Sequence, residues 1–342
     1  MTFDPRNILV IDFGQMGDVV LSLPALAALR RRFPLARLTV AVGKPGRQVV
    51  ELSACADEVL VVDRVALRDG FAPLSVARVA RIVREVRSRR FDFCVDLHSL
   101  SETNLLGLLS GAPQRLYSRR PGRSLDFLSN FRPRPPVEDR AKHAVERYLD
   151  VLGPLGVGEV ERAPRLPLRE EAGRAVEQLF KKLKVPRDAP LVGVFPGAGH
   201  PSRRWPLERF AELAGMFARN DRLHTLLFIG PEELPRAKEI RAAFPAAITT
   251  AIERLDIPQL AAALARASVF VSNDTGPVHI AAAVGTPVVA LVGRPTPDGY
   301  EPVGRGHRTI FSRSIELITV EEVYTAARAA LVAERTASIF AS

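Results

Sequence analysis

The sequence predicts an α/β protein made of two doubly wound parallel-sheet domains that face each other across a cleft. The chain has 342 residues, which exceeds the length at which a single hydrophobic core usually stops growing. Short β-branched runs alternate with helical periods in both halves, and this order requires crossover connections and hence parallel strands. Doubly wound folds bind ligands beyond the carboxyl ends of their strands, so we expect the substrate site at those ends.

The first half begins with a buried strand at 7–13, and the helix that follows it is expected at 18–33. Further strands are expected at 37–42, 58–63 and 91–97. From about 131 to 170 the pattern loosens around Pro-rich stretches, although 139–153 within it is helical. We place the domain junction in this segment.

The second half repeats the alternation. We expect strands at 190–197, 224–230, 246–251, 268–272 and 287–293, and helices at 207–219, 232–243, 257–266 and 276–284. The predicted organisation is an N-terminal domain, a linker, a C-terminal domain and a final helix end with its tail, at 1–160, 161–185, 186–325 and 326–342.

Composition indicates an ordinary globular protein, with 47% hydrophobic and 25% charged residues. No stretch approaches the roughly 18 uninterrupted apolar residues of a membrane span. Asp4 and Asp12 lie where a secretory signal would need an apolar core, so we expect a cytoplasmic location. Cys55 and Cys94 stand singly, which predicts neither a disulfide framework nor a zinc site.

The formal net charge of +10 comes largely from arginine. Segment 114–135 contains six arginines and a single acid, Asp126. Arginine forks suit phosphate oxygens, which favours an anionic substrate, or peripheral contact with the inner face of the inner membrane. Solvated arginine-rich helix faces are the alternative explanation. Nucleic acid is not expected as a partner, because no nucleic-acid-binding motif and no aromatic interleaving accompany the arginines.

The stretch "DFGQMGDVVLSLPA" at 12–25 combines a strand end, a turn from Gly14 to Gly17, and Asp18 at the start of a helix. Its glycine spacing is not the dinucleotide fingerprint, which argues against a nicotinamide enzyme. Asp18 could be the helix N-cap. It could instead be a carboxylate that removes a proton from a substrate hydroxyl.

The stretch "PGAGHPSRRWPLERFAELA" at 196–214 is a second strand, loop and helix. Gly197 and Ser202 would let the backbone approach a ligand, and Arg203 and Arg204 supply positive charge beside a helix start. Backbone N–H groups and cations together predict an anion site. An ordinary polar surface loop remains the alternative.

The stretch "VSNDTGPVHIAAAVGTPVVALVG" at 271–293 is the third such junction. Asp274, Thr275 and Gly276 begin a helix whose exposed N–H groups suit a phosphate. Thr275 and His279 are four residues apart, so both can reach one ligand. The alternative is a capping Asp-Thr pair with a buried structural histidine.

Together with "FDFCVDLHS" (91–99) and "KHAVERYLDVLGPLG" (142–156), these motifs resemble the lipopolysaccharide heptosyltransferases, glycosyltransferase family 9, over nearly the whole chain. The resemblance implies the GT-B architecture of two Rossmann-like domains. It also implies metal-independent, inverting transfer of heptose from ADP-L-glycero-D-manno-heptose to a hydroxyl of the lipopolysaccharide inner core. ADP-heptose is then a donor substrate, and no cofactor is expected.

The resemblance also implies roles for individual residues. Asp18 matches the general base, and Asp274, Thr275, Gly276 and His279 match the site for the donor's diphosphate and sugar. Where the family usually has a lysine before Trp-Pro, this chain has Arg203 and Arg204. Glu232 is a candidate for an acidic residue that contacts the adenosine part of the donor. The candidates for binding an anionic acceptor are Gly17, Arg119, Arg120 and Arg123.

Two other functions fit the same residues. One is a different nucleotide-sugar reaction on this architecture, such as a 2-epimerase or a transferase with another acceptor. The other is a non-catalytic relative that binds a nucleotide sugar without turnover.

Overall fold

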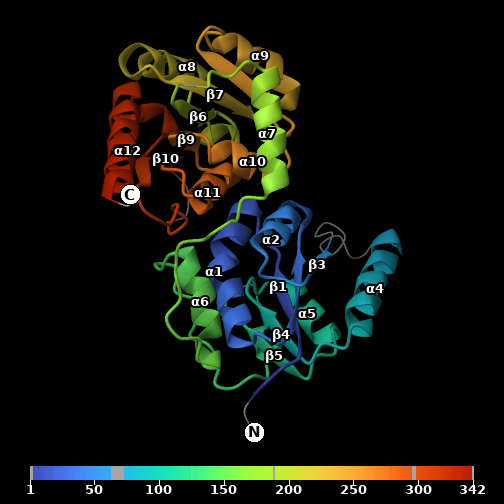
Figure 1. The fold of residues 1–342 in the computed structure, drawn as a ribbon. Coiled ribbons are helices and arrows are strands. Elements are labelled where there is room, and N and C mark those ends of the chain that lie inside the picture. The colour runs from blue at the N-terminus through green and yellow to red at the C-terminus, as the bar shows by residue number, and fades with distance from the viewer. Residues whose placement is uncertain (1–2, 63–72, 123, 188, 295–297, 341–342) are drawn as a thin grey trace. The chain divides into compact units, whose positions relative to one another are not determined.

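The computed structural model describes residues 3–62, 73–122, 124–187, 189–294 and 298–340. The chain divides into two compact units, Met1–Pro164 and Arg165–Ser342, here called unit 1 and unit 2. Each unit has its own parallel sheet with helices packed on it (Figure 1). The predicted α/β class with two doubly wound, Rossmann-like units is therefore confirmed.

Unit 1 has a five-stranded sheet with the order β3-β2-β1-β4-β5, in which every pair is parallel. The strands are β1 (Asn7–Asp12), β2 (Arg37–Val42), β3 (Glu58–Val61), β4 (Phe93–Asp96) and β5 (Gln114–Tyr117). The α-helices are α1 (Met16–Arg32), α2 (Arg47–Ser53), α4 (Pro73–Ser88), α5 (Ser101–Leu109) and α6 (Ala144–Leu152). Short 3₁₀ turns are η1 (Lys44–Gly46), η2 (Asp126–Leu128) and η3 (Gly153–Leu155).

Unit 2 has a six-stranded parallel sheet with the order β11-β10-β9-β6-β7-β8. The strands are β6 (Leu191–Phe195), β7 (His224–Ile229), β8 (Thr249–Glu253), β9 (Val269–Asn273), β10 (Val288–Gly293) and β11 (Arg308–Ser312). The α-helices are α7 (Glu170–Lys182), α8 (Leu207–Met216), α9 (Ala237–Ala243), α10 (Ile257–Leu264), α11 (Gly276–Ala283) and α12 (Val320–Phe340). Shorter turns are η4 (Pro201–Arg203), the π-helical η5 (Phe217–Asp221), η6 (Leu234–Arg236) and η7 (Ile315–Leu317).

The central strands are apolar on both faces because helices cover both sides of a parallel sheet. Every residue of β6, β9 and β10 is buried, and so are the last five of β1. Burying each large apolar side chain contributes about 1.5–3 kcal/mol to folding. Trp205 and Phe210 extend the core of unit 2, with their rings edge to face at 4.8 Å. These cores hold the strand ends, and therefore the loops that follow them, in fixed positions.

Several predicted boundaries need correction. The predicted linker 161–185 contains α7, which buries Ala172, Val176 and Phe180 at four-residue spacing and belongs to unit 2. Strands β5 and β11 were not predicted, because both are sheet edges with polar, partly exposed residues. Residues 326–340 continue α12, which begins at Val320.

Strand order defines one special position in each sheet. In unit 1 the chain moves from β1 outward to β2 and β3, and then returns to β4 on the other side of β1. In unit 2 it moves from β6 to β7 and β8, and returns to β9 on the other side of β6. At such a switch point the two following loops separate, which leaves a ligand crevice beyond the strand ends. The switch points are therefore β1/β4 in unit 1 and β6/β9 in unit 2.

Candidate active site

Asp18 lies in the first turn of α1, the helix that follows β1 at the switch point of unit 1. It is the third residue of α1, whose N-cap is Gln15, so Asp18 is not itself the N-cap but is the acid of a capping box with Gln15. Its Oδ2 accepts a hydrogen bond from the backbone N–H of Gln15 at 2.7 Å. Its other oxygen makes no hydrogen bond with any described residue and is available to a ligand. A Cβ at Gly14 would lie 2.4 Å from the Cβ of Asp18, so only glycine allows this close approach.

The environment of Asp18 raises the pKa of its carboxyl group above the ordinary value. Burial is the largest cause, and the nearby charge of Asp12 acts in the same direction. The Gln15 N–H is the main opposing influence, and the charges of His98 and Arg147 add to it. A carboxylate with a raised pKa is a stronger base, which suits proton removal from a hydroxyl.

His98 and Asp12 are members of this group that sequence reasoning missed. Asp12 ends β1, is fully buried and accepts the N–H of Gly14 at 3.0 Å. His98 follows β4, and its Nδ1 lies 4.0 Å from Oδ1 of Asp12. His98 is part of the sequence motif "VDLHS", but only the pairing of β4 with β1 shows that it lies beside Asp18.

A buried network fixes the turn that carries His98. Oδ1 of Asp96 accepts the backbone N–H groups of His98 and Ser99 at 3.0 and 2.7 Å, and Oδ2 accepts Nδ2 of Asn104 at 2.7 Å. Ser99 has a φ of 47°, and its hydroxyl donates to the carbonyl of Ser118 at 2.6 Å. Burial raises the pKa of Asp96 to about 7, although the hydrogen bonds from these donors act to lower it. The network holds the backbone of the turn from which the His98 side chain projects.

The predicted acceptor-binding residues separate into two places. Arg120 lies beside the Asp18 group, because its Nη1 donates to the carbonyl of His98 at 3.3 Å. Its Nε is 3.4 Å from Glu138, a carboxylate that Arg147 also contacts at 3.2 Å.

Arg119 instead lies toward η2, with its Nε 3.9 Å from Asp126. Gly17 is the second residue of α1, next to Asp18. Arg123 lies outside the described residues.

In unit 2, Asn273 joins the loops on both sides of the switch point. Its Nδ2 donates to the carbonyls of Pro196 and Gly197 at 2.8 and 3.3 Å, and its Oδ1 accepts the N–H of Trp205 at 2.9 Å. Sequence reasoning missed this residue, which ends β9. It holds the loop after β6 against the start of α11.

The two adjacent arginines of this loop have different roles. Arg204 donates from Nε to the carbonyl of Ala198 at 3.0 Å, so it stabilises the loop itself. Among the described residues, the side chain of Arg203 has no hydrogen bond or ion pair. Ser202 is exposed, and its hydroxyl lies 2.7 Å from Nδ1 of His200. Arg203 is therefore the cation that remains available to a ligand.

The helix α11 begins beside this loop without a side-chain cap. Thr275 is the N-cap, and its hydroxyl makes no capping hydrogen bond, so capping by the threonine of the Asp-Thr alternative is not observed. Asp274, Thr275 and Gly276 are all partly exposed. His279 is only 6% exposed and lies within the packed part of α11, which favours the structural alternative for this residue.

The acid of the loop after β7 also differs from the expectation. Glu232 is exposed, whereas its neighbour Glu233 is buried. A Cβ at Gly197 would lie 2.4 Å from Oε1 of Glu233, and one at Gly230 would lie 2.7 Å from Oε2. Burial raises the pKa of Glu233, as does the charge of Glu232, while backbone N–H groups and Arg204 oppose the shift. The absence of a side chain at Gly197 therefore makes room for Glu233, which is a structural reason for this glycine that does not depend on a ligand.

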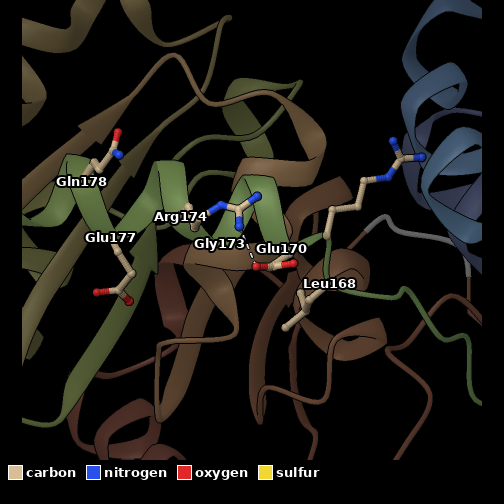
Figure 2. Close-up of a pocket in the computed structure, with 7 residues that line it drawn as sticks. Leu168, Glu170, Gly173, Arg174, Glu177 and Gln178 are labelled. Carbon is tan, nitrogen blue, oxygen red and sulfur yellow. Dashed lines mark hydrogen bonds and ion pairs between the residues drawn. The ribbon is translucent and has the colours of Figure 1, made fainter.

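A groove on unit 2 lies apart from these residues. It follows one side of α7 and is lined by Leu168, Arg169, Glu170, Gly173, Arg174, Glu177 and Gln178 (Figure 2). Arg174 is paired with Glu170, one turn earlier on the same helix. Within the described ranges, no group of three His, Cys, Asp or Glu side chains is arranged to hold a metal ion.

The chain is similar to known proteins over most of its length. A sequence model described as glycosyltransferase family 9 (heptosyltransferase) matches residues 79–326, more than half of the chain. Lipopolysaccharide heptosyltransferase 2 of Salmonella typhimurium is 26% identical over 313 residues, which are 89% of this chain and 87% of that protein.

Solved structures agree with this similarity. A glycosyl transferase family 9 protein from Veillonella parvula superimposes with a TM-score of 0.83 at 26% identity, covering 97% of this chain and 99% of that one. The E. coli ADP-heptose lps heptosyltransferase II gives 0.77 at 24% identity, covering 96% and 99%. The second of these supports the fold alone.

Proposed function

Because this chain belongs to glycosyltransferase family 9 and is therefore a glycosyltransferase, we propose that it transfers heptose from ADP-L-glycero-D-manno-heptose to a hydroxyl of the lipopolysaccharide inner core. Its similarity to a lipopolysaccharide heptosyltransferase supports this donor and acceptor. The proposed transfer inverts the anomeric centre and requires neither a metal ion nor a cofactor. One observation carries the proposal: a partly buried carboxylate of raised pKa at the switch point of unit 1.

In the proposed reaction, Asp18 is the general base. Its Oδ2 is held by the Gln15 N–H, so the other oxygen takes the proton from the acceptor hydroxyl as that hydroxyl attacks the anomeric carbon. Arg147 places positive charge near this carboxylate, and Arg120, which donates to the carbonyl of His98, adds positive charge for an anionic acceptor. Gly17, Arg119 and Arg123 remain candidates for acceptor contacts.

Unit 2 is proposed to bind the donor. The uncapped start of α11 offers N–H groups and a partial positive charge to the diphosphate. Arg203 would neutralise the charge that develops on the departing ADP. Asp274, Thr275 and Gly276 border that site, with Ser202 and Gly197 on the facing loop. We assign the adenosine contact to the exposed Glu232 and a loop-packing role to Glu233.

The substitution Asp18→Asn tests the proposal most simply, because asparagine keeps an oxygen for the Gln15 N–H but cannot act as a base. We expect nucleotide release to fall about 10²–10⁴-fold, the usual contribution of general base catalysis. ADP affinity, measured by titration calorimetry, should be unchanged, and Asp4→Asn serves as the exposed control.

Unchanged turnover in Asp18→Asn would refute the base assignment. A panel of nucleotide sugars in the same assay tests the donor, because release from another donor but not from ADP-heptose would replace the proposed substrate. Binding of ADP without release from any donor would leave a non-catalytic binding protein.

A further inference from the structure

Unit 1 exposes four large apolar side chains on two elements that are in contact, α5 and η2. Leu105, Leu108 and Leu109 on α5 are 43%, 37% and 40% exposed, and Phe127 on η2 is 69% exposed. We call these four residues the apolar face. The opposite side of α5, with Thr103, Asn104, Leu106 and Gly107, is buried against the sheet. A helix packed in this way normally presents polar residues to water, so the leucines call for another explanation.

The two elements that carry the apolar face are held together. The backbone N–H of Leu125 donates to Oδ1 of Asn104 at 2.8 Å, which ties the start of η2 to α5. Leu128, at the end of η2, packs on the same core cluster that contains Leu106. Phe127 is thus presented to solvent by a short turn whose two ends are anchored, one to α5 and the other to the core beneath that helix.

Arginines border the apolar face on the η2 side. The Nε of Arg115 donates to the carbonyl of Leu128 at 3.2 Å, and Arg134 donates to the carbonyl of Asp126. Arg119 lies 3.9 Å from the carboxylate of Asp126, the single acid of segment 114–135. The exposed phenylalanine therefore lies among guanidinium groups that outnumber the nearby acid.

The α4 side of the apolar face is also cationic. Helix α4 lies alongside α5 (Figure 1), and the two helices are in contact. It presents Arg81, Arg84 and Arg87 to solvent. Its Glu85 is paired with Arg89 at 3.0 Å, so it does not neutralise these three. In the described part of the chain, no helix is long and apolar enough to cross a bilayer.

We propose that the apolar face and its bordering arginines dock unit 1 onto the anionic phospholipid surface of a membrane. Leucine and phenylalanine side chains enter the boundary between headgroups and acyl chains, and the surrounding arginines pair with lipid phosphates. A second copy of this chain does not fit, because two such cationic borders would repel each other. The inference deepens the proposed function, since a lipid-anchored acceptor would lie at that surface, where Arg119 approaches Asp126 of η2.

Vesicle co-sedimentation of the full chain tests the docking without donor or acceptor. We expect binding to vesicles of phosphatidylglycerol and phosphatidylcholine, little binding to phosphatidylcholine alone, and release at high salt as the arginine contacts are screened. The triple variant Leu105→Ser, Leu109→Ser and Phe127→Ser should bind at least about tenfold more weakly, because it removes most of the apolar area. The charge variant Arg84→Glu should weaken binding severalfold.

Matched controls use exposed side chains elsewhere. Leu35→Ser and Leu317→Ser replace leucines that are 84% and 59% exposed outside the apolar face, and Arg187→Glu reverses an exposed charge on unit 2. These variants should bind like the unmodified protein, and thermal melts confirm folding of all of them.

Equal vesicle binding by the triple variant and its controls would overturn the inference. Equal binding to neutral and anionic vesicles would do the same, as would a change in oligomeric state of the triple variant with no change in vesicle binding. Failure of Asp18→Asn to lower turnover would overturn the base assignment and leave the vesicle result standing, so the two proposals fail separately.

Discussion

The two switch points carry opposite chemistry on the same kind of scaffold. At β1/β4 the protein gathers carboxylates, and burial raises the pKa of both Asp18 and Asp96. At β6/β9 it leaves a helix start uncapped and a guanidinium, Arg203, without a protein partner among the described residues. The first arrangement suits a general base, and the second suits an anion, as the proposed function requires. The comparison shows that a doubly wound sheet supplies only the position, while the loop residues decide the chemistry.

The largest expected effect in unit 2 concerns Arg203. Arg203→Ala should lower kcat/KM for the donor by about 10²-fold, because it removes a cation that stabilises the leaving diphosphate. Arg204→Ala should instead lower the melting temperature of the protein, since Arg204 holds the carbonyl of Ala198. Steady-state kinetics and thermal melts of both variants, with Arg187→Ala as the exposed control, measure the difference. The reverse pattern would exchange the two assignments.

A smaller effect is expected at the glycine that lies against the base. Gly14→Ala places a methyl group 2.4 Å from the Cβ of Asp18, so it should destabilise the fold by about 1–3 kcal/mol and displace the carboxylate. Gly158→Ala is the matched control, because nothing lies within 4 Å of its added methyl group. Urea unfolding and turnover of both variants test this. Equal stability of the two would show that the turn after β1 adjusts freely.

The smallest effect is a pH dependence of stability from Asp96. Its pKa is about 7 in the folded protein, so between the ordinary value near 3.8 and pH 7 the folded state holds a proton that the unfolded state has lost. This stabilising contribution is complete below the ordinary pKa and declines as pH rises through 7, by at most about 1.4 kcal/mol per pH unit.

Urea unfolding at pH 5.5 and pH 8 measures this contribution. The unmodified protein should lose more stability across this interval than Asp96→Asn, whose side chain does not titrate. Asp4→Asn is the exposed control, and it should follow the unmodified protein. An identical pH dependence in Asp96→Asn would show that this carboxyl group is already ionised at pH 5.5.

The sequence was sufficient for the buried parts of the fold and for the two strand ends that matter most. Strands such as β1 and β9 are largely apolar runs, and Asp18 and Thr275 lie at the starts of the helices that follow them. The edge strands β5 and β11 lack that signal because part of their surface faces water. Helix α7 had the four-residue stripe of Ala172, Val176 and Phe180, but its Pro-rich flanks suggested a linker.

Other features of the site needed coordinates. His98 joins Asp12 and Asp18 only because β4 pairs with β1, and strand order is not written in the local pattern. Between neighbours such as Arg203 and Arg204, or Glu232 and Glu233, the direction of each side chain depends on the loop backbone. The chemistry of these loops was therefore predictable by residue type, while the assignment to one residue of each pair was not.

The pH profile of the unmodified enzyme tests the central difference between the two switch points most directly. If Asp18 is the base, kcat/KM falls on the acid side with an apparent pKa above the ordinary 3.8 of aspartate, whereas ADP affinity over the same range does not follow this limb. An acid limb that persists in the residual activity of Asp18→Asn, or that governs ADP binding as well, would contradict the account.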